Sequence, residues 1–113
     1  MLPEFEFTVR REVLEWYRSG GKDLEVRVGF PMFRRLCVGQ VLKLYNNNDG
    51  AVRCRIQVIR RYRCFEQMLE NERAERIVPG IESNEILLRE FHKIWPVDAE
   101  RHGVLVFEVI KLS

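Results

Sequence analysis

The feature that most constrains the fold is a turn followed by a strongly alternating segment. Residues 46–50 read Asn-Asn-Asn-Asp-Gly, and the closing Asp-Gly pair is typical of the tight loops of β-hairpins. In the segment after the turn the apolar residues are two apart, which places them on one face of a strand. They are Val52, Cys54, Ile56 and Val58. Residues 36–45 contain a second strand pattern, so the sequence predicts a hairpin.

Hydrophobic spacing predicts further elements on both sides of this hairpin. After an extended start, we expect helices at residues 8–19, 64–76 and 83–94, and strands at residues 24–28 and 104–112. Glycines would cap the first helix at its end, and Ser83 is a good N-cap for the third. This order predicts an α+β fold with a mixed, mostly antiparallel sheet. We expect the sheet to curl into a small β-barrel flanked by about three helices.

Size and composition are those of one globular domain covering residues 1–113. The chain is 46% hydrophobic and 32% charged, which is ordinary for a globular protein. No apolar run is long enough to span a bilayer, so no membrane partner is expected. The first residues lack the basic and apolar segments of a signal peptide, and we therefore expect a cytoplasmic protein. Nothing in the sequence indicates its oligomeric state.

Cysteines and histidines give no pattern typical of a metal site. Cys37, Cys54 and Cys64 have no Cys-x-x-Cys spacing, and we expect buried free thiols rather than disulfides. His92 and His102 are isolated, with no other ligand-type residue at metal spacing. We therefore expect neither a metal ion nor a cofactor.

The charge is nearly balanced overall but unevenly distributed. Nineteen basic and seventeen acidic residues give a net charge of +2, which does not indicate a nucleic-acid-binding protein by itself. Residues 53–63 nevertheless contain five arginines, and Tyr62 stands among them. Arg60, Arg61 and Tyr62 are candidates for phosphate binding and base stacking. The alternative is a strand end with solvated arginines beside a salt-bridged acidic helix.

A second candidate site lies where the first helix pattern changes to a strand. Residues 20–27 read Gly-Gly-Lys-Asp-Leu-Glu-Val-Arg, and Glu25 and Arg27 are two apart, on one face of the strand. Lys22 stands at the strand entrance. These three side chains predict either a polar pocket or an internal salt bridge that orders the junction.

Five segments, in the same order along the chain as in the family, resemble the ASCH domain, a family of the PUA-like superfamily. Residues 20–27 match every fixed position of the family's Gly-x-Lys-x-x-Glu-x-Arg signature. The other segments, in chain order, are residues 33–40, 58–65, 94–96 and 103–108. Gln40 replaces the Asp that usually follows the Val-Gly pair. The resemblance implies a small PUA-like barrel with a cleft between barrel and helices, lined by Lys22, Glu25 and Arg27.

The same resemblance implies a link to RNA, and we expect a module that binds RNA or a modified nucleotide. One branch of the family hydrolyses acetylated cytidine with a threonine nucleophile, but this chain has Glu25 at that position. The later glutamate of that branch aligns near Gly80, close to Glu82. A small nucleoside hydrolase or a ribonuclease, with Lys22 and Glu25 as candidate catalytic groups, is the alternative. A third possibility is a protein-interaction module whose cleft is fully salt-bridged.

Overall fold

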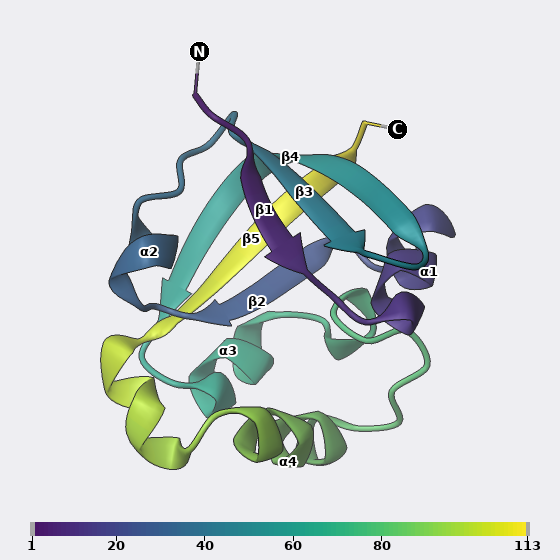
Figure 1. Ribbon diagram of the computed structural model, residues 1–113. Coiled ribbons are helices and arrows are strands. Elements are labelled where there is room, and N and C mark those ends of the chain that lie inside the picture. The colour runs from purple at the N-terminus through teal and green to yellow at the C-terminus, as the bar shows by residue number, and fades with distance from the viewer. Residues whose placement is uncertain (1, 113) are drawn as a thin grey trace.

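The computed structural model describes residues 2–112, in which a curved five-stranded sheet arches over helices (Figure 1). The strands are β1 (Phe5–Thr8), β2 (Leu24–Val28), β3 (Val41–Asn46), β4 (Gly50–Tyr62) and β5 (Val104–Lys111). The helices are α1 (Arg11–Arg18), α2 (Pro31–Arg34), α3 (Phe65–Asn71) and α4 (Asn84–Ile94), with the 3₁₀ helices η1 (Ala74–Arg76) and η2 (Val97–His102).

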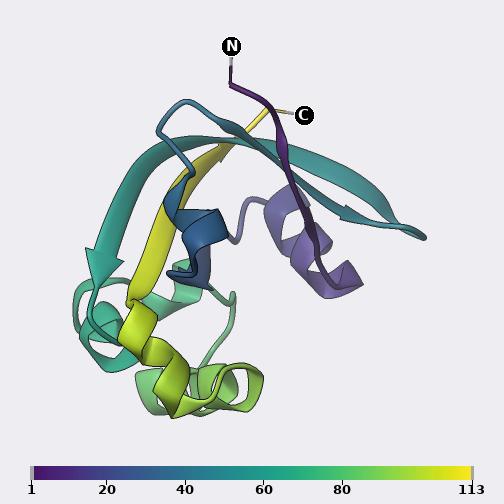
Figure 2. The same cartoon turned by 60° about the vertical axis from the view of Figure 1, so that its left-hand side comes forward.

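The sheet is a curled half-barrel and not the closed barrel that we expected. Its strand order is β1-β3-β4-β5-β2, and the edge strands β1 and β2 do not pair with each other. The sheet is mixed, because β1 runs parallel to β3 while the other neighbours are antiparallel. The arch leaves its concave side open to α1 and α2, as Figure 2 shows.

The predicted hairpin is confirmed, with one displaced residue. Leu44 faces Val52 across β3 and β4, and the apolar face that contains Val52 is buried. Val58 was expected on that face but is exposed, because the register between β4 and β5 shifts between Ile56 and Val58. An extra residue at such a bulge turns the following side chains to the other face of the strand. Residues 36–40 form no strand, and β3 begins at Val41.

The long helices are confirmed, and the expected number of about three is too low. Within residues 2–112 the chain forms four α-helices and two 3₁₀ helices, because α2, η1 and η2 are too short to show a hydrophobic period. Helix α1 begins at Arg11, since Thr8 belongs to β1, and α3 ends at Asn71 instead of residue 76. The Ser83 side chain accepts a hydrogen bond from the Ile86 N–H, as expected of an N-cap.

Two apolar clusters stabilise the two sides of the sheet. One fills the half-barrel, where Leu14 and Tyr17 of α1 pack with the inward residues of β3, β4 and β5. The other lies between β2, β5 and the helices α3 and α4, and includes Phe65 and Phe91. Strand β2 therefore has apolar contacts on one face, which leaves its other face for charged groups.

Within residues 2–112, no helix has both the length and the apolar character needed to cross a membrane. All three cysteines are free, as expected, but only Cys54 is buried. Cys37 is exposed, because the segment that carries it is a surface turn between α2 and β3.

Candidate functional site

The structure brings Lys22, Glu25 and Arg27 together at the edge strand β2. Leu24, Val26 and Val28 point toward α3 and α4, so the alternating Glu25 and Arg27 point into the half-barrel. Their partners there come from α1 and β1. The three charged side chains that the sequence analysis placed together are therefore neighbours in the structure.

Glu25 is the centre of this cluster. It is only 5% exposed, and one of its oxygens, Oε1, accepts a hydrogen bond from the Tyr17 hydroxyl. The other, Oε2, accepts a hydrogen bond from Arg27 Nε at 2.9 Å and lies 2.8 Å from Arg27 Nη2 in an ion pair. A buried carboxylate is stable only when it is paired and hydrogen-bonded, and Glu25 meets both conditions.

Lys22 is buried as well, and its ammonium points at backbone carbonyls. It is 7% exposed, and Nζ donates to the carbonyl oxygens of Leu24 at 2.6 Å and Ile77 at 2.8 Å. The Glu25 Oε1 atom lies 3.9 Å away. Lys22 therefore ties the start of β2 to the segment after η1, and its hydrogen-bonding capacity is largely used.

Burial and charge act against each other on the pKa values of this cluster. Burial lowers the pKa of the Lys22 ammonium, and the nearby Glu25 carboxylate only partly offsets this. Burial would raise the pKa of Glu25, but Arg27, Lys22 and the hydrogen bond from Tyr17 together hold it below its ordinary value. Burial and the Glu25 charge raise the pKa of the Tyr17 hydroxyl well above its ordinary value. Glu25 is therefore an ionised carboxylate at neutral pH.

Arg27 differs from the other two because it reaches the surface of the site. Its side chain is 21% exposed, against 6% for that of Glu25. The guanidinium carbon lies 4.6 Å from the centre of the Phe7 ring and 5.8 Å from that of Phe33. Among residues 2–112 its hydrogen bond goes to Glu25 through Nε, and Nη2 forms an ion pair with the same oxygen, which leaves Nη1 available to another acceptor.

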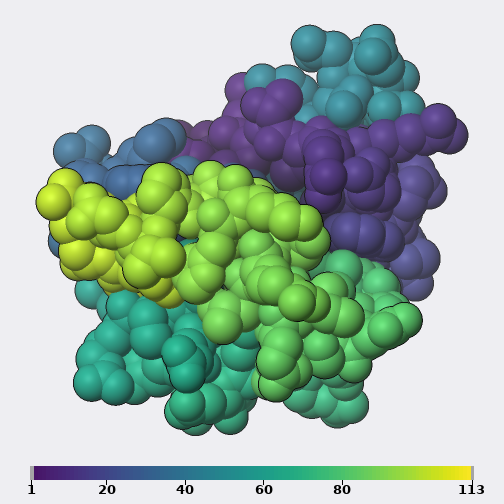
Figure 3. Space-filling model, turned by 90° about the horizontal axis from the view of Figure 1, so that it is seen from below, coloured from purple at the N-terminus to yellow at the C-terminus, as the bar shows by residue number. Residues whose placement is uncertain are grey.

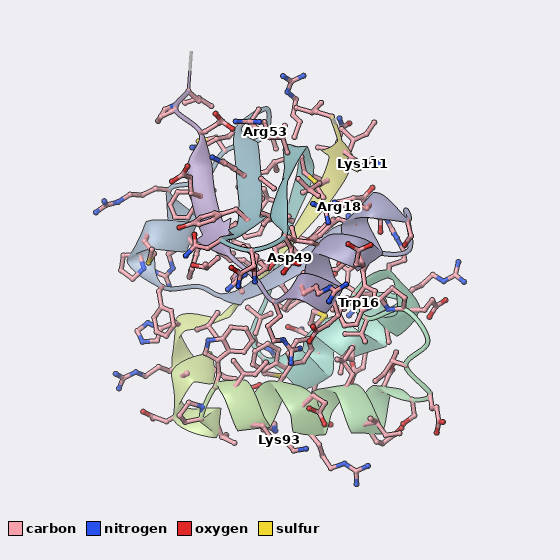
Figure 4. The ribbon with its side chains drawn as sticks, turned by 45° about the vertical axis from the view of Figure 1, so that its right-hand side comes forward. Trp16, Arg18, Asp49, Arg53, Lys93 and Lys111 are labelled. Carbon is pink, nitrogen blue, oxygen red and sulfur yellow. The ribbon has the colours of Figure 1, made fainter. Side chains whose placement is uncertain are left out.

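A cavity of about 420 Å³ opens beside this cluster. Its walls come from the end of β1 and α1, from β2, and from the segments around η1 and α4, and they include Trp16, Arg27 and Trp95. Seen from below, the N-terminal segment with α1 (purple) borders α4 (green) (Figure 3). Trp16 projects from α1 in Figure 4. Trp16 and Trp95 are each partly exposed and border the cavity.

Arg60, Arg61 and Tyr62 do not line this cavity. Arg60 forms a bidentate pair with Glu72, through Nε at 2.5 Å and Nη2 at 2.9 Å, and Nη1 lies 2.9 Å from Glu108. The Tyr62 hydroxyl donates to the same Glu72 at 2.6 Å. Arg61 is exposed. A contact of these three residues with RNA stays a prediction, and two of them already have strong protein partners.

The described residues contain no group of three or more metal-ligating side chains at metal-binding geometry. His92 lies with Nε2 3.5 Å from Glu100, and His102 packs against Phe30, so the two histidines belong to separate surroundings. The chemistry available at the site is therefore that of Arg27, the buried Lys22–Glu25 pair and the aromatic walls.

Comparisons with known proteins identify the fold. No family model and no curated protein matches this chain. The crystal structure of the hypothetical protein PH0355 is similar, with 23% identity, a TM-score of 0.89, and coverage of 97% of this chain and 100% of that one. The solution NMR structure of the protein PF0455 from Pyrococcus furiosus has 28% identity, a TM-score of 0.81, and coverage of 98% and 99%. The chain therefore has the α+β half-barrel fold of these small proteins.

Proposed function

We propose that the protein binds RNA, or a modified nucleotide, in the cavity beside Lys22, Glu25 and Arg27. The observation that carries this proposal is the combination of the 420 Å³ cavity with two tryptophans and a partly exposed guanidinium in its walls. Small-molecule sites commonly measure about 300–1,000 Å³ and combine apolar walls with a few polar groups. A nucleobase fits a cavity of this kind.

The residues at the cavity supply the two interactions that single-stranded RNA needs. Trp16 and Trp95 offer aromatic faces, and base–aromatic stacking contributes about 1–3 kcal/mol per base. Arg27 has Nη1 available to a phosphate or a base oxygen, and Arg10 also lines the cavity. Glu25 orients Arg27 and offsets the cost of burying it.

The resemblance to ASCH domains supports the same proposal from the sequence. All three signature residues lie at this cavity, which agrees with the cleft that the resemblance implies. We therefore propose that the half-barrel is a PUA-like, ASCH-type RNA-binding domain, with Lys22 and Glu25 as the buried support of the site and Arg27 as its ligand-contacting member.

Binding of labelled RNA tests the proposal. Fluorescence anisotropy with single-stranded RNA decamers should show binding that weakens as salt rises, because phosphate contacts release counterions. Arg27→Ala should weaken it at least about tenfold, the loss of one charge-assisted contact. Arg89→Ala is the matched control, since Arg89 is exposed on α4 and does not line the cavity. Equal affinities of the two variants would overturn the proposal.

A hydrolase acting on a nucleoside or on RNA is the second candidate. It is favoured by one observation, the buried Lys22–Glu25 pair with Nζ and Oε1 3.9 Å apart. Its weakness is that Tyr17, Arg27 and two carbonyls already occupy these groups. Incubation with N4-acetylcytidine and with short RNAs, followed by chromatography, decides between the candidates. Absence of product above a folded Glu25→Gln control rejects the hydrolase.

A further inference from the structure

The backbone of β2 presents hydrogen-bonding groups along the open edge of the sheet. The Asp23 carbonyl accepts from the Val109 N–H, and the Gly29 N–H donates to the Gly103 carbonyl, so these odd-numbered residues face β5. Backbone groups of successive strand residues point to opposite edges. The N–H and C=O groups of Leu24, Val26 and Val28 therefore point away from β5, to the edge that no strand of residues 2–112 covers.

Among the residues that the structure describes, Val26 is the one of these three whose N–H and C=O both lack a partner outside the sheet. The Leu24 carbonyl accepts from Lys22 Nζ at 2.6 Å, and the Val28 carbonyl accepts from the Phe30 N–H at 2.8 Å. Within residues 2–112, neither a side chain nor a backbone group outside the sheet is bonded to the N–H or C=O of Val26. One donor and one acceptor thus stand side by side on the edge strand.

The cavity runs along the edge that carries this pair, because its walls include Arg27 from one face of β2 and Phe91 from the helices packed on the other. Val26 lines it between Glu25 and Arg27, and Trp16 and Trp95 belong to the same walls. A backbone N–H and C=O that stay unpaired beside an apolar wall have a strong tendency to find partners. A ligand that fills the cavity can therefore place an acceptor against the Val26 N–H and a donor against the Val26 C=O.

We propose that this pair reads the Watson–Crick edge of an unpaired RNA base. This proposal rests on the proposed function, RNA binding in the cavity, and adds that the group bound there is an unpaired base. Each of the four bases carries a donor and an acceptor side by side on that edge, and proteins read such edges in single-stranded RNA. The base would bond to Val26 while an aromatic wall stacks on its face. A base in a duplex has this edge occupied and is excluded.

An extended peptide is a poorer occupant of the same edge. Strand addition uses the backbone groups of several alternate residues. Here the carbonyls of Leu24 and Val28 already accept hydrogen bonds, from Lys22 Nζ and from the Phe30 N–H. Blocking an edge in this way prevents strand pairing but leaves room for a single planar ring.

Methylated RNA tests the inference. Octamers of each base are titrated into ¹⁵N-labelled protein, and the best-bound octamer is compared with two methylated forms. Methylation of the Watson–Crick ring nitrogen, N3 of a pyrimidine or N1 of a purine, should weaken binding at least about tenfold. Methylation at pyrimidine C5 or purine C8 is the control and should change affinity less than about twofold. The Val26 amide should also exchange at least about tenfold more slowly in the complex.

The other outcomes separate this inference from the proposed function. Equal affinity for the edge-methylated octamer, with the loss in Arg27→Ala intact, rejects base-edge reading and leaves RNA binding standing. No binding of any octamer rejects both. An uncharged pentapeptide of alternating threonine and valine serves as the competing probe. If it binds and protects the amides of Leu24, Val26 and Val28 together, the edge is a peptide site and the inference is wrong.

Discussion

The guanidinium of Arg27 lies over the ring of Phe7, with 4.6 Å between the guanidinium carbon and the ring centre. Arg27 belongs to β2 and Phe7 to β1, so this contact joins the two edge strands that share no backbone hydrogen bond. A cation over an aromatic face is stabilised by about 0.5–2 kcal/mol, more when it is shielded from water. The open side of the half-barrel is thus bridged by side chains.

A double-mutant cycle on this pair should show a favourable coupling. Phe7→Leu and Arg27→Met each keep an apolar side chain but remove the cation or the ring. Their coupling free energy, from urea unfolding, should be about 0.5–1 kcal/mol. Phe5→Leu is the control, because Phe5 packs on Phe7 while Arg27 lies over the rings of Phe7 and Phe33. If the coupling free energy with Arg27 is the same for Phe5 as for Phe7, the cation–π contact between Arg27 and Phe7 does not stabilise the fold.

Glu25→Gln should destabilise the protein at neutral pH and reduce its acid sensitivity. The change leaves Lys22 and Arg27 beside a neutral group, and breaking a buried ion pair costs about 3–5 kcal/mol. The folded-state pKa of Glu25 is below its ordinary value of 4.5. Its stabilisation is therefore fully present above about pH 4.5 and is lost as pH falls through the folded pKa.

Urea unfolding between pH 7 and pH 2 measures this effect. The difference in unfolding free energy between the native protein and Glu25→Gln should be largest at neutral pH and shrink in acid. Glu72, whose pKa is also lowered, supplies a remaining slope in the variant. A difference that stays constant across this pH range would show that the Glu25 charge does not act as argued.

Lys22 should be the slowest of the four lysines to react with an acetylating reagent. Its side chain is 7% exposed, against 31% for Lys43 and 70% for Lys93. Both hydrogen bonds of Nζ must break before it reaches solvent, which requires local opening of the fold. Peptide mass spectrometry after limited acetylation should find Lys22 modified at least about tenfold more slowly than Lys93. Equal rates would mean that the ammonium is accessible.

Arg60→Ala and Arg61→Ala should separate a structural arginine from a candidate RNA contact. Arg60→Ala leaves the Glu72 carboxylate without its bidentate partner and should cost about 1.5–3 kcal/mol of unfolding free energy. The exposed Arg61→Ala should stay within about 0.5 kcal/mol. If Arg61 contacts a phosphate, its loss should weaken RNA binding and lower the salt slope by about one. An unchanged slope would contradict the prediction that Arg61 belongs to the binding site.

Hydrophobic periodicity predicted the long elements of this fold. It could not predict that the sheet stays open between β1 and β2. The β3–β4 hairpin, strand β5 and helix α4 each have enough residues to show a hydrophobic period. Helix α2, at four residues, is too short to show one. The gap between β1 and β2 depends on contacts between residues far apart in the chain, such as Arg27 and Phe7. Local pattern holds no information about such contacts.

The charged cluster beside the cavity could be predicted from the sequence, whereas the aromatic residues of the cavity walls could not. Spacing and the ASCH resemblance identified Lys22, Glu25 and Arg27, which the structure brings together. Tyr17 and the tryptophans read as ordinary helix and core residues, because an aromatic side chain at helical spacing has the same pattern in a core and in a cavity wall. Arg60 and Tyr62 formed a basic-aromatic pattern whose acidic partner, Glu72, is distant in sequence.

The cavity walls join residues as far apart in sequence as Thr8 and Trp95. No single hairpin or helix can form such a cavity, so it is absent until the N-terminal segment and α4 have both docked. A ligand that needs the complete cavity has no affinity for partly folded chains. It therefore raises the free energy of global unfolding, by about 2.7 kcal/mol when free ligand is 100-fold above its Kd. A thermal shift in the presence of a candidate nucleotide thus reports binding to the completed fold without any assumption about the chemistry of the site.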